Sequence, residues 1–265
     1  MKLCSIASSS GGNCIYVGSN STHLLIDAGI SMKKIEEGLK EIGVKGEDLN
    51  GILVTHEHVD HISGLGPFSR KYGIPIYSTK GTHLGIELNK NTGVILEKLF
   101  HDVLPDEMFS IGDIDVRPFR ISHDAKEPTG FRIESGDKSV AIATDLGVYD
   151  SYIIDNLKEL DAIVIEANHD TYMVEVGPYP YHLKQRVLGP KGHLSNELTG
   201  RLLCNILHDE LKYIILGHLS KDNNYDELAK ETVKLEVTMG PTSFKGEDLN
   251  LLIAERDKVS CIIEV

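Results

Sequence analysis

The stretch Gly51–His61 constrains the fold of this chain more than any other. It opens with a short apolar run that is typical of a strand buried on both faces of a sheet. Metal-binding residue types follow this run within six positions: His56, His58, Asp60 and His61. Because side chains alternate along an extended chain, His56 and His58 are expected to point the same way, whereas Asp60 and His61 follow a change of direction. Imidazole and carboxylate ligands suit Zn²⁺, Fe²⁺ or Mn²⁺, so the stretch predicts a metal site for two ions.

Composition places the chain among ordinary globular proteins and indicates a compartment. Its 265 residues are 41% hydrophobic and 25% charged, which is enough to bury a large core. No apolar run approaches the roughly 20 residues that a membrane span requires, and the amino terminus lacks the hydrophobic stretch of a signal peptide. The 4 cysteines are scattered without a C-x-x-C pair, as expected of reduced thiols. We therefore expect a cytoplasmic protein that does not associate with membranes.

The net charge of −13 bears on whether the chain acts on nucleic acid. Proteins that coat polyanions usually carry a basic surface, so this charge disfavours tight non-specific binding to DNA. Two divalent cations would nevertheless add positive charge where a phosphate binds, so a nuclease is not excluded. The segment between Tyr179 and His193 has no acidic residue, and its charged side chains are those of Lys184, Arg186 and Lys191. The segment is either a solvated loop or, as we expect, a contact for the sugar-phosphate backbone of a nucleic-acid substrate.

Short strands and helices alternate along the rest of the chain, which predicts a mixed α and β fold with two apolar sheets. Strands are expected over residues 2–7, 14–18, 23–27, 51–54, 75–78, 130–134, 140–144, 162–165, 213–216, 249–254 and 259–263, and a hairpin arm or two strands over 108–121. Helices are expected over residues 31–42, 82–89, 150–160, 195–207 and 224–237, and a loop over 177–192. Since no linker interrupts this pattern, we expect a single domain over residues 1–265.

Outside Gly51–His61, three further predicted strands are followed by a residue type that binds metals: His123, Asp145 and His218. Each of them alone is more simply explained as a surface residue that follows a strand. Considered together, they suggest a shared site, because rigid strands can hold several side chains at one rim of a fold.

With these residues in view, Thr55–His61 resembles the signature of the metallo-β-lactamase superfamily of binuclear hydrolases, and the three later strand ends resemble its remaining ligands. The resemblance implies an α+β fold, the αββα sandwich of two facing mixed β-sheets with helices on the outside. It also implies two divalent metal ions per chain, of Zn, Mn or Fe. One ion would be bound by His56, His58 and His123, the other by Asp60, His61 and His218, and Asp145 would bridge them.

Glu166 and His193 carry a narrower resemblance. Glu166 follows the strand at 162–165, and His193 precedes a predicted helix. These surroundings are similar to those in the phosphodiesterase branch that includes tRNA 3′-processing nucleases. There the matching pair protonates the leaving group, so we expect His193 to be a general acid oriented by Glu166 and Asp60 to take the proton of the attacking water. His169 lies just after the same strand, and either a place in the cleft or a structural role is open to it.

Over nearly its whole length the chain is similar to the bacterial WalJ (YycJ, VicX) family of cytoplasmic metal-dependent nucleases. This resemblance implies a phosphodiesterase that uses a metal-bridged hydroxide, and we expect a 5′→3′ exonuclease on double-stranded DNA. DNA is favoured over RNA as the substrate. Two alternatives stay open: a carboxylic ester, thioester or lactone hydrolase of the glyoxalase II type, and a metal-binding regulatory protein with weak activity. The sequence leaves the native metal and the oligomeric state open.

Overall fold

The structure is a computed structural model that describes residues 1–265. Its residues group into two compact units. Unit 1 comprises Met1–Arg120, Ala125–Lys138 and Glu255–Val265, and unit 2 comprises Ile121–Asp124 and Ser139–Ala254. None of the helices combines the length and the apolarity that crossing a membrane requires. The single domain over residues 1–265 stays a prediction.

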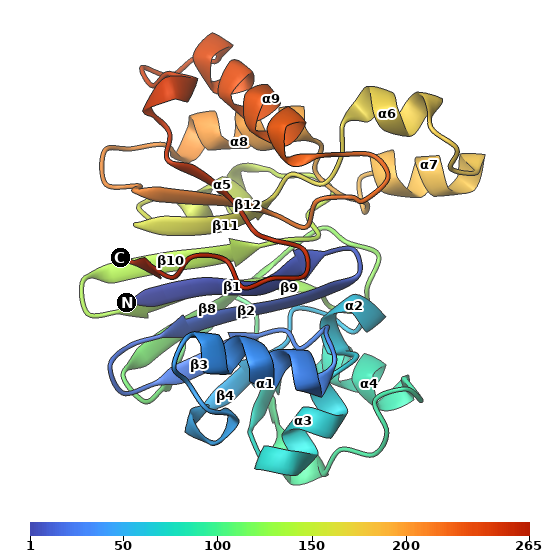
Figure 1. Cartoon of the computed structure of the whole chain (residues 1–265), viewed down its shortest axis with the longest axis vertical. Coiled ribbons are helices and arrows are strands. Elements are labelled where there is room, and N and C mark those ends of the chain that lie inside the picture. The colour runs from blue at the N-terminus through green and yellow to red at the C-terminus, as the bar shows by residue number, and fades with distance from the viewer. The chain divides into compact units, whose positions relative to one another are not determined.

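A seven-stranded sheet in unit 1 contains β4, the strand at which the stretch Gly51–His61 begins (Figure 1). Its strands, in spatial order, are β14 (Ile263–Glu264), β1 (Lys2–Ser9), β2 (Gly12–Gly18), β3 (His23–Ile26), β4 (Gly51–Leu53), β5 (Ile76–Ser78) and β6 (Phe100–Asp102). The three predicted strands at the start of the chain form a meander, because β1, β2 and β3 pair antiparallel, and β3 to β6 then pair in parallel. The strand predicted over 259–263 is wrong for most of its length, since only β14 forms there and the residues before it have no regular structure.

The helices of unit 1 begin and end at residues that suit these positions. They are α1 (Met32–Glu41), α2 (Val59–Ile62), α3 (Leu65–Tyr72) and α4 (Lys80–Leu88). Ser31, at the start of the helix predicted over 31–42, caps α1, because its hydroxyl accepts a hydrogen bond from the backbone N–H of Lys34 at 3.4 Å. Ile35 and Leu39 of α1 are fully buried and pack in the core under the sheet. α3 ends at Gly73, whose φ of 67° is the left-handed conformation that glycine favours at a helix end.

Unit 1 also contains the antiparallel strands β7 (Phe109–Ile111), β8 (Ile114–Arg120) and β9 (Thr129–Ser135). The hairpin predicted in this region is confirmed, with Gly112 at φ 58° in the turn between β7 and β8. β8 leads directly into the segment that holds His123.

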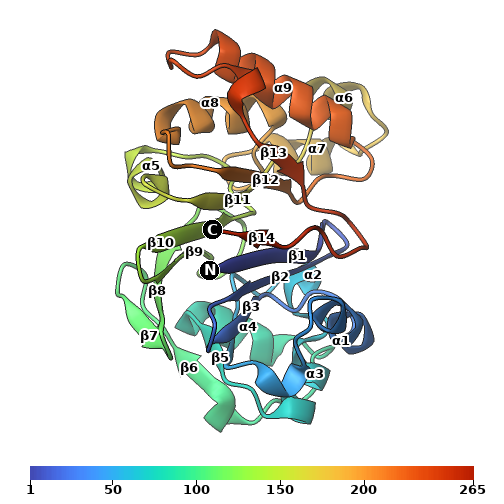
Figure 2. The ribbon, with the colours of Figure 1, turned by 60° about the vertical axis from the view of Figure 1, so that its left-hand side comes forward.

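In unit 2, four parallel strands carry most of the later candidate residues: β10 (Lys138–Ala143), β11 (Ala162–Glu166), β12 (Tyr213–Gly217) and β13 (Leu251–Ile253). The strands β10 to β12 are almost entirely buried apolar runs, as expected of parallel strands covered on both faces. The helices of the unit include α5 (Ser151–Leu157), α8 (Asn196–Ile206) and α9 (Asp226–Met239), and α8 and α9 pack side by side (Figure 2).

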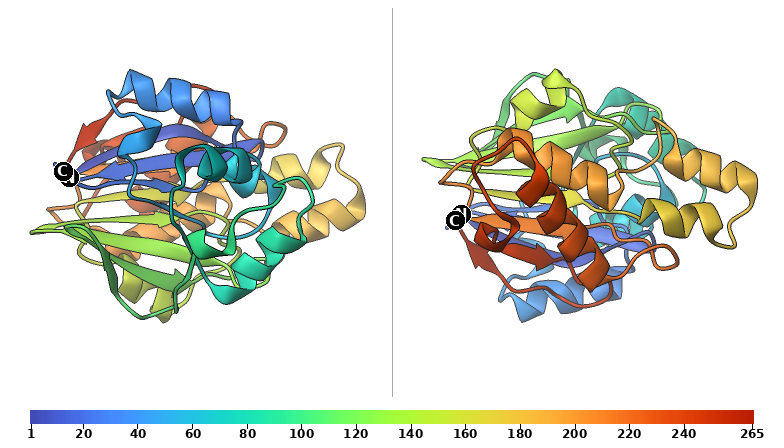
Figure 3. Two further views of the ribbon diagram at one scale, coloured as in Figure 1. Left: turned by 90° about the horizontal axis from the view of Figure 1, so that it is seen from below. Right: turned by 90° about the horizontal axis from the view of Figure 1, so that it is seen from above.

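The loop predicted over residues 177–192 is wrong in part, because it contains the helix α7 (Tyr181–Leu188). A second helix, α6 (Thr171–Val176), begins just after β11, where the carboxylate of Asp170 accepts from the N–H of Met173 at 2.8 Å. The Pro- and Tyr-rich composition before α7 suggests a loop, but Pro180 stands directly before the first helical residue, where proline is tolerated. Together α6 and α7 form an arm that projects beyond α8 and α9 (Figure 3).

The hexapeptide K-G-E-D-L-N occurs twice, at Lys45–Asn50 and Lys245–Asn250. Each copy forms a 3-10 helix, η1 (Gly46–Asp48) or η3 (Gly246–Asp248), shortly before a parallel strand. The aspartate of each copy accepts a hydrogen bond from the lysine N–H three residues earlier, at 2.9 Å in the first copy and 2.8 Å in the second. The same six residues therefore form the same turn before β4 and before β13. The conformation of this turn is determined by its own sequence.

We predict that the thiols differ sharply in reactivity. Cys261 is exposed, whereas Cys4 and Cys14 are fully buried. Burial raises the pKa of Cys4 to about 12 and also raises the pKa of Cys14. Because the thiolate is the reactive form, roughly one Cys4 in 10⁴ is reactive at pH 8. Ellman's reagent should therefore modify Cys261 rapidly in the folded protein, and Cys4 and Cys14 only in guanidinium. Rapid modification of either buried thiol in the native state would contradict the packing around β1 and β2.

Candidate metal centre

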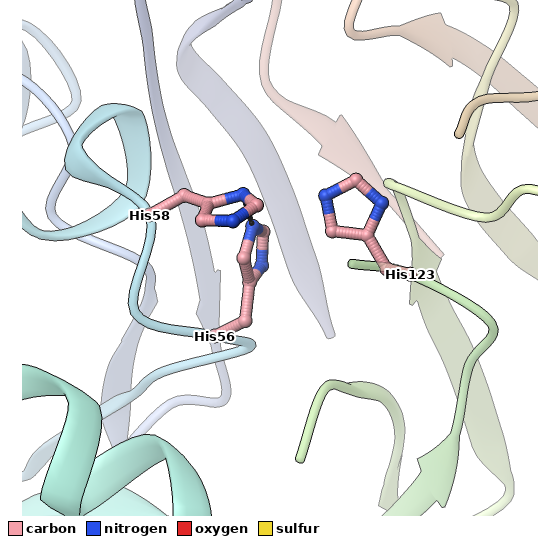
Figure 4. Close-up of side chains that lie close together, drawn as sticks. All are labelled: His56, His58 and His123. Carbon is pink, nitrogen blue, oxygen red and sulfur yellow. Dashed lines mark hydrogen bonds between the residues drawn. The ribbon is translucent and has the colours of Figure 1, made fainter. Parts of the chain in front are cut away.

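The predicted metal ligands divide between the two units, with His56, His58, Asp60 and His61 in unit 1 and His123, Asp145 and His218 in unit 2. In unit 1 the chain continues from β4 toward α2, and His58 is the residue at which α2 begins. Figure 4 shows His56 and His58 on this connection, and His123 on the segment that follows β8. The rings of His56 and His58 lie with their centroids 4.5 Å apart, and Nε2 of His56 is 3.0 Å from Nδ1 of His58. The two imidazoles thus address the same point, as the alternation of side chains predicts.

Asp27 supports His61 and is a residue that the sequence analysis missed. His61 lies on α2, and its Nδ1 is 2.7 Å from Oδ2 of Asp27. Thr55 holds this carboxylate in place, since its N–H donates to Oδ1 at 2.8 Å and its hydroxyl donates to Oδ2 at 2.9 Å. With Nδ1 of His61 engaged, Nε2 is the atom that would bind a metal; it lies 3.5 Å from the carboxylate of Asp60 and 3.2 Å from the amide nitrogen of Asn13. The only available signal was an aspartate directly after the buried strand β3.

A glycine lets α2 approach β3 closely. A Cβ on Gly29 would lie 1.7 Å from the carbonyl oxygen of Asp60, so no other residue fits there without a shift of the backbone. Gly29 also follows Asp27 by two residues. The end of β3 and the start of α2 are therefore held together at the place where Asp27 meets His61.

In unit 2 the carboxyl ends of parallel strands bring the later residues together. Asp145 follows β10, Glu166 ends β11 and His218 follows β12. Oδ1 of Asp145 lies 3.6 Å from Nε2 of His123, 3.5 Å from Nε2 of His218 and 3.6 Å from Nδ1 of His193. Asp145 and His218 both have positive φ, 58° and 54°, so the backbone turns sharply where each strand ends. The strand ends thus form a cluster around the carboxylate of Asp145.

Glu166 is completely buried and holds His193. Its Oε2 lies 3.1 Å from Nδ1 of His193. Its Oε1 accepts backbone hydrogen bonds from Leu146 at 2.5 Å and from Leu194 at 3.0 Å. The ring of His193 also stacks on that of His218, with centroids 5.2 Å apart. These contacts fix the orientation of His193 and leave its Nε2 for another group.

Two further residues of interest follow β11, and one of them, Asn168, contacts His218. The amide nitrogen of Asn168 lies 3.1 Å from Nδ1 of His218 and donates to the His218 carbonyl at 2.8 Å. His169 has an exposed fraction of 1%, and its ring contacts Asn168. Burial, and to a lesser extent the neighbouring His193, lowers the pKa of His169 to about 4, so this imidazole is neutral near pH 7. Of the two roles open to His169, its burial favours the structural one.

The three basic side chains predicted to contact a DNA strand lie on or next to the arm formed by α6 and α7. Lys184 on α7 donates to the carbonyl of Glu175 at 2.6 Å and keeps its charge at the surface. Lys191 is exposed in the connection that follows α7. Arg186 has a different environment, because its guanidinium forms two hydrogen bonds with the carboxylate of Asp124.

The donor atoms fit divalent cations. Two donors that each lie 2.0–2.1 Å from one tetrahedral ion are about 3.3–3.4 Å apart. In unit 2 the observed separations from Asp145 to His123 and His218 are 3.6 and 3.5 Å, and in unit 1 that from Asp60 to His61 is 3.5 Å. Asp145, Glu166, His193 and His218 together form one group that is able to hold a metal ion. Buried carboxylates beside imidazoles in this way are stabilised by a bound cation.

Comparison with known proteins agrees with this geometry. The family described as the Beta-lactamase superfamily domain matches residues 22–211. The chain is 41% identical over 260 residues to the protein named Exodeoxyribonuclease WalJ of Streptococcus pneumoniae, covering 98% of this chain and 96% of the relative. It is 39% identical over 236 residues to Exodeoxyribonuclease YycJ of Bacillus anthracis, covering 86% of each. The crystal structure of the metallo-β-lactamase fold protein YhfI of Bacillus subtilis superimposes with a TM-score of 0.69 at 19% identity, over 98% of both chains.

These findings confirm the predicted fold class, an α+β sandwich with two mixed sheets of seven strands each and helices. They also bear out the resemblance drawn from Thr55–His61 and the later strand ends. The chain belongs to the metallo-β-lactamase superfamily and, within it, to the family of the WalJ and YycJ exodeoxyribonucleases.

Proposed function

We propose that the protein is a metal-dependent exodeoxyribonuclease that hydrolyses phosphodiester bonds of double-stranded DNA in the 5′→3′ direction, in the cytoplasm. The observation that carries this proposal is the 41% identity, over 98% of the chain, with a protein named as an exodeoxyribonuclease. The pair of the buried Glu166 and the partly exposed His193 supports it, since a positioned imidazole suits the release of a basic sugar oxygen.

We propose two ions, of Zn, Mn or Fe, bound by the ligand set of the superfamily. One ion would be bound by His56, His58 and His123, the other by Asp60, His61 and His218, and both by Asp145. When bound, the ions activate a water molecule and offset negative charge on the phosphate. The support of His61 by Asp27 favours this assignment, because a carboxylate on the second ring nitrogen orients a metal-binding histidine.

The protein's own residues would move the protons. Asp60, whose side chain is partly exposed, takes the proton of the attacking water. His193 gives a proton from Nε2 to the departing sugar oxygen, since its Nδ1 is engaged by Glu166. Glu166 keeps the ring in this orientation through its own two backbone hydrogen bonds.

The arm offers a surface for the DNA strand. Tyr172 and Tyr181 are 69% and 77% exposed on α6 and α7, and Lys184 and Lys191 lie nearby in the sequence. Exposed aromatic rings stack on bases, and lysines pair with phosphates without regard to sequence. We therefore propose that Lys184, Arg186 and Lys191 contact the DNA strand, and Arg186 is in addition paired with Asp124.

The assay that tests this function compares substrates in the presence of Mn²⁺ or Zn²⁺. We expect cleavage of duplex DNA that carries a 5′-phosphate and of the small diester bis-p-nitrophenyl phosphate. Acyl-glutathione and lactones should be poor substrates. Robust thioester hydrolysis with no diesterase activity would instead favour a hydrolase of the glyoxalase II type.

Metal content provides a direct prediction. The reconstituted protein should contain two transition-metal ions per chain by elemental analysis. Asp145→Ala should lose metal from both positions, because the carboxylate is proposed to bridge the ions and lies within 3.6 Å of His123 and His218. Retention of both ions by this variant would exclude a bridging role.

His193→Ala should discriminate between substrates by their leaving groups. A nitrophenolate leaves readily without a proton, whereas a sugar alkoxide needs one. Because general-acid catalysis contributes about 10²–10⁴-fold, DNA cleavage should fall by about that factor while hydrolysis of the nitrophenyl diester falls much less. Glu166→Gln should show the same selectivity in milder form, and both variants should keep their metals. The exposed His101 on β6 of unit 1, which is not part of the arm, provides the matched control, His101→Ala. Equal losses on both substrates would assign His193 another role.

Lys184→Glu should weaken action on long DNA more than on the small diester, because only the long substrate reaches the arm. The salt dependence of DNA binding should also become less steep, by about one unit in the log–log slope. Lys212→Glu, at an exposed lysine beside Glu210 before β12, is the matched control and should leave DNA binding as it is. If the two charge reversals weakened DNA binding equally, this would argue against a contact between α7 and the DNA strand.

A further inference from the structure

Asp124 lies next to the ring atom of His123 that is available to a metal. Nδ1 of His123 is 3.1 Å from the carbonyl oxygen of Gly192, which leaves Nε2 as the metal-binding atom. Oδ1 of Asp124 lies 3.4 Å from this Nε2. Since donors on one tetrahedral ion are about 3.3–3.4 Å apart, the Asp124 carboxylate is within reach of an ion bound by His123. Asp124 is nevertheless absent from the ligand set that the superfamily implies.

Arg186 engages this same carboxylate from α7. Its Nε donates to Oδ2 of Asp124 at 2.5 Å, and its Nη2 donates to Oδ1 at 3.0 Å. Such two-point pairing of guanidinium and carboxylate fixes the geometry of both groups and is among the stronger hydrogen-bonded arrangements in proteins. The oxygen nearest to His123 thus already accepts a charge-assisted hydrogen bond, which reduces its strength as a metal ligand.

A catalytic metal needs a coordination position that the protein does not fill. If the Asp124 carboxylate joined the ion at His123, it would take the position that water or substrate requires. We propose that Arg186 is a positioning residue that withholds Asp124 from this metal and so keeps a coordination position open. This inference rests on the metal binding put forward above, and the expectation that Arg186 contacts the DNA backbone stays a separate prediction.

The test measures the affinity for Zn²⁺ by competition with a chromophoric chelator, together with turnover of bis-p-nitrophenyl phosphate. Arg186→Met removes the guanidinium that pairs with the Asp124 carboxylate, so the zinc affinity should rise by about tenfold or more, the scale on which groups around a metal site act. Turnover of the small diester should fall in the same variant. The double variant Arg186→Met with Asp124→Asn lacks the competing charge and should return to the affinity of the unmodified protein.

A matched control is available on α8, where Arg201 pairs through two nitrogens with Glu236 at the surface. Arg201→Met removes a similar ion pair away from the metal ligands and should leave zinc affinity and turnover unchanged. Arg186→Lys keeps the positive charge beside Asp124 and should stay close to the unmodified protein in affinity. Thermal unfolding of each variant establishes that it is folded.

The outcomes separate this inference from the proposed function. If the unmodified protein binds no metal, the proposed function fails. If it binds metal but Arg186→Met lowers the affinity or leaves it unchanged, Arg186 does not withhold Asp124. A double variant that keeps the raised affinity would equally overturn the inference, because the gain would then not come from the Asp124 carboxylate.

Discussion

The burial of three carboxylates is the constraint on which the rest of the site depends. Asp27 and Asp145 have exposed fractions of 2%, and Glu166 is completely buried. An ionised carboxylate without partners is costly in such surroundings, so each of them needs hydrogen bonds or positive charge. Asp27 is satisfied by Thr55 and His61, and Glu166 by two backbone N–H groups and His193. All three carboxylates lie at or just after the end of a strand, β3, β10 or β11.

The three carboxylates differ in what they contribute to chemistry. Asp27 and Glu166 each lie against one ring nitrogen of a histidine and thereby orient the other nitrogen toward a metal or a substrate. Asp145 instead has imidazole nitrogens of three histidines within 3.6 Å, an arrangement that a bound cation stabilises. Two carboxylates therefore act through histidines, and the third is placed to meet a metal directly.

The helix α7 of the arm links the residues proposed to contact DNA with the candidate metal ligands of unit 2. The carbonyl of Val187 near the end of α7 accepts a hydrogen bond from the N–H of His193, and the carbonyl of Gly192 lies at Nδ1 of His123. Arg186 of the same helix pairs with Asp124 beside His123. A displacement of α7 would thus be felt at His193, His123 and Asp124 together. This linkage gives a physical reason why one short helix can affect both the handling of substrate and the metal environment.

Most strands, the α8 helix with its cap, the hairpin and the metal-binding residue types follow from the sequence itself. Periodicity, capping by Ser31 and the turn at Gly112 depend on neighbouring residues, and the two copies of K-G-E-D-L-N form the same turn in different places. Only the tertiary structure brought Asp27 to His61, Asn168 to His218 and Arg186 to Asp124, and it showed α7 where a loop was predicted. These pairs link residues 34, 50 and 62 positions apart. Local sequence carries no signal for such partners, because they depend on which strand ends meet at one edge of a sheet.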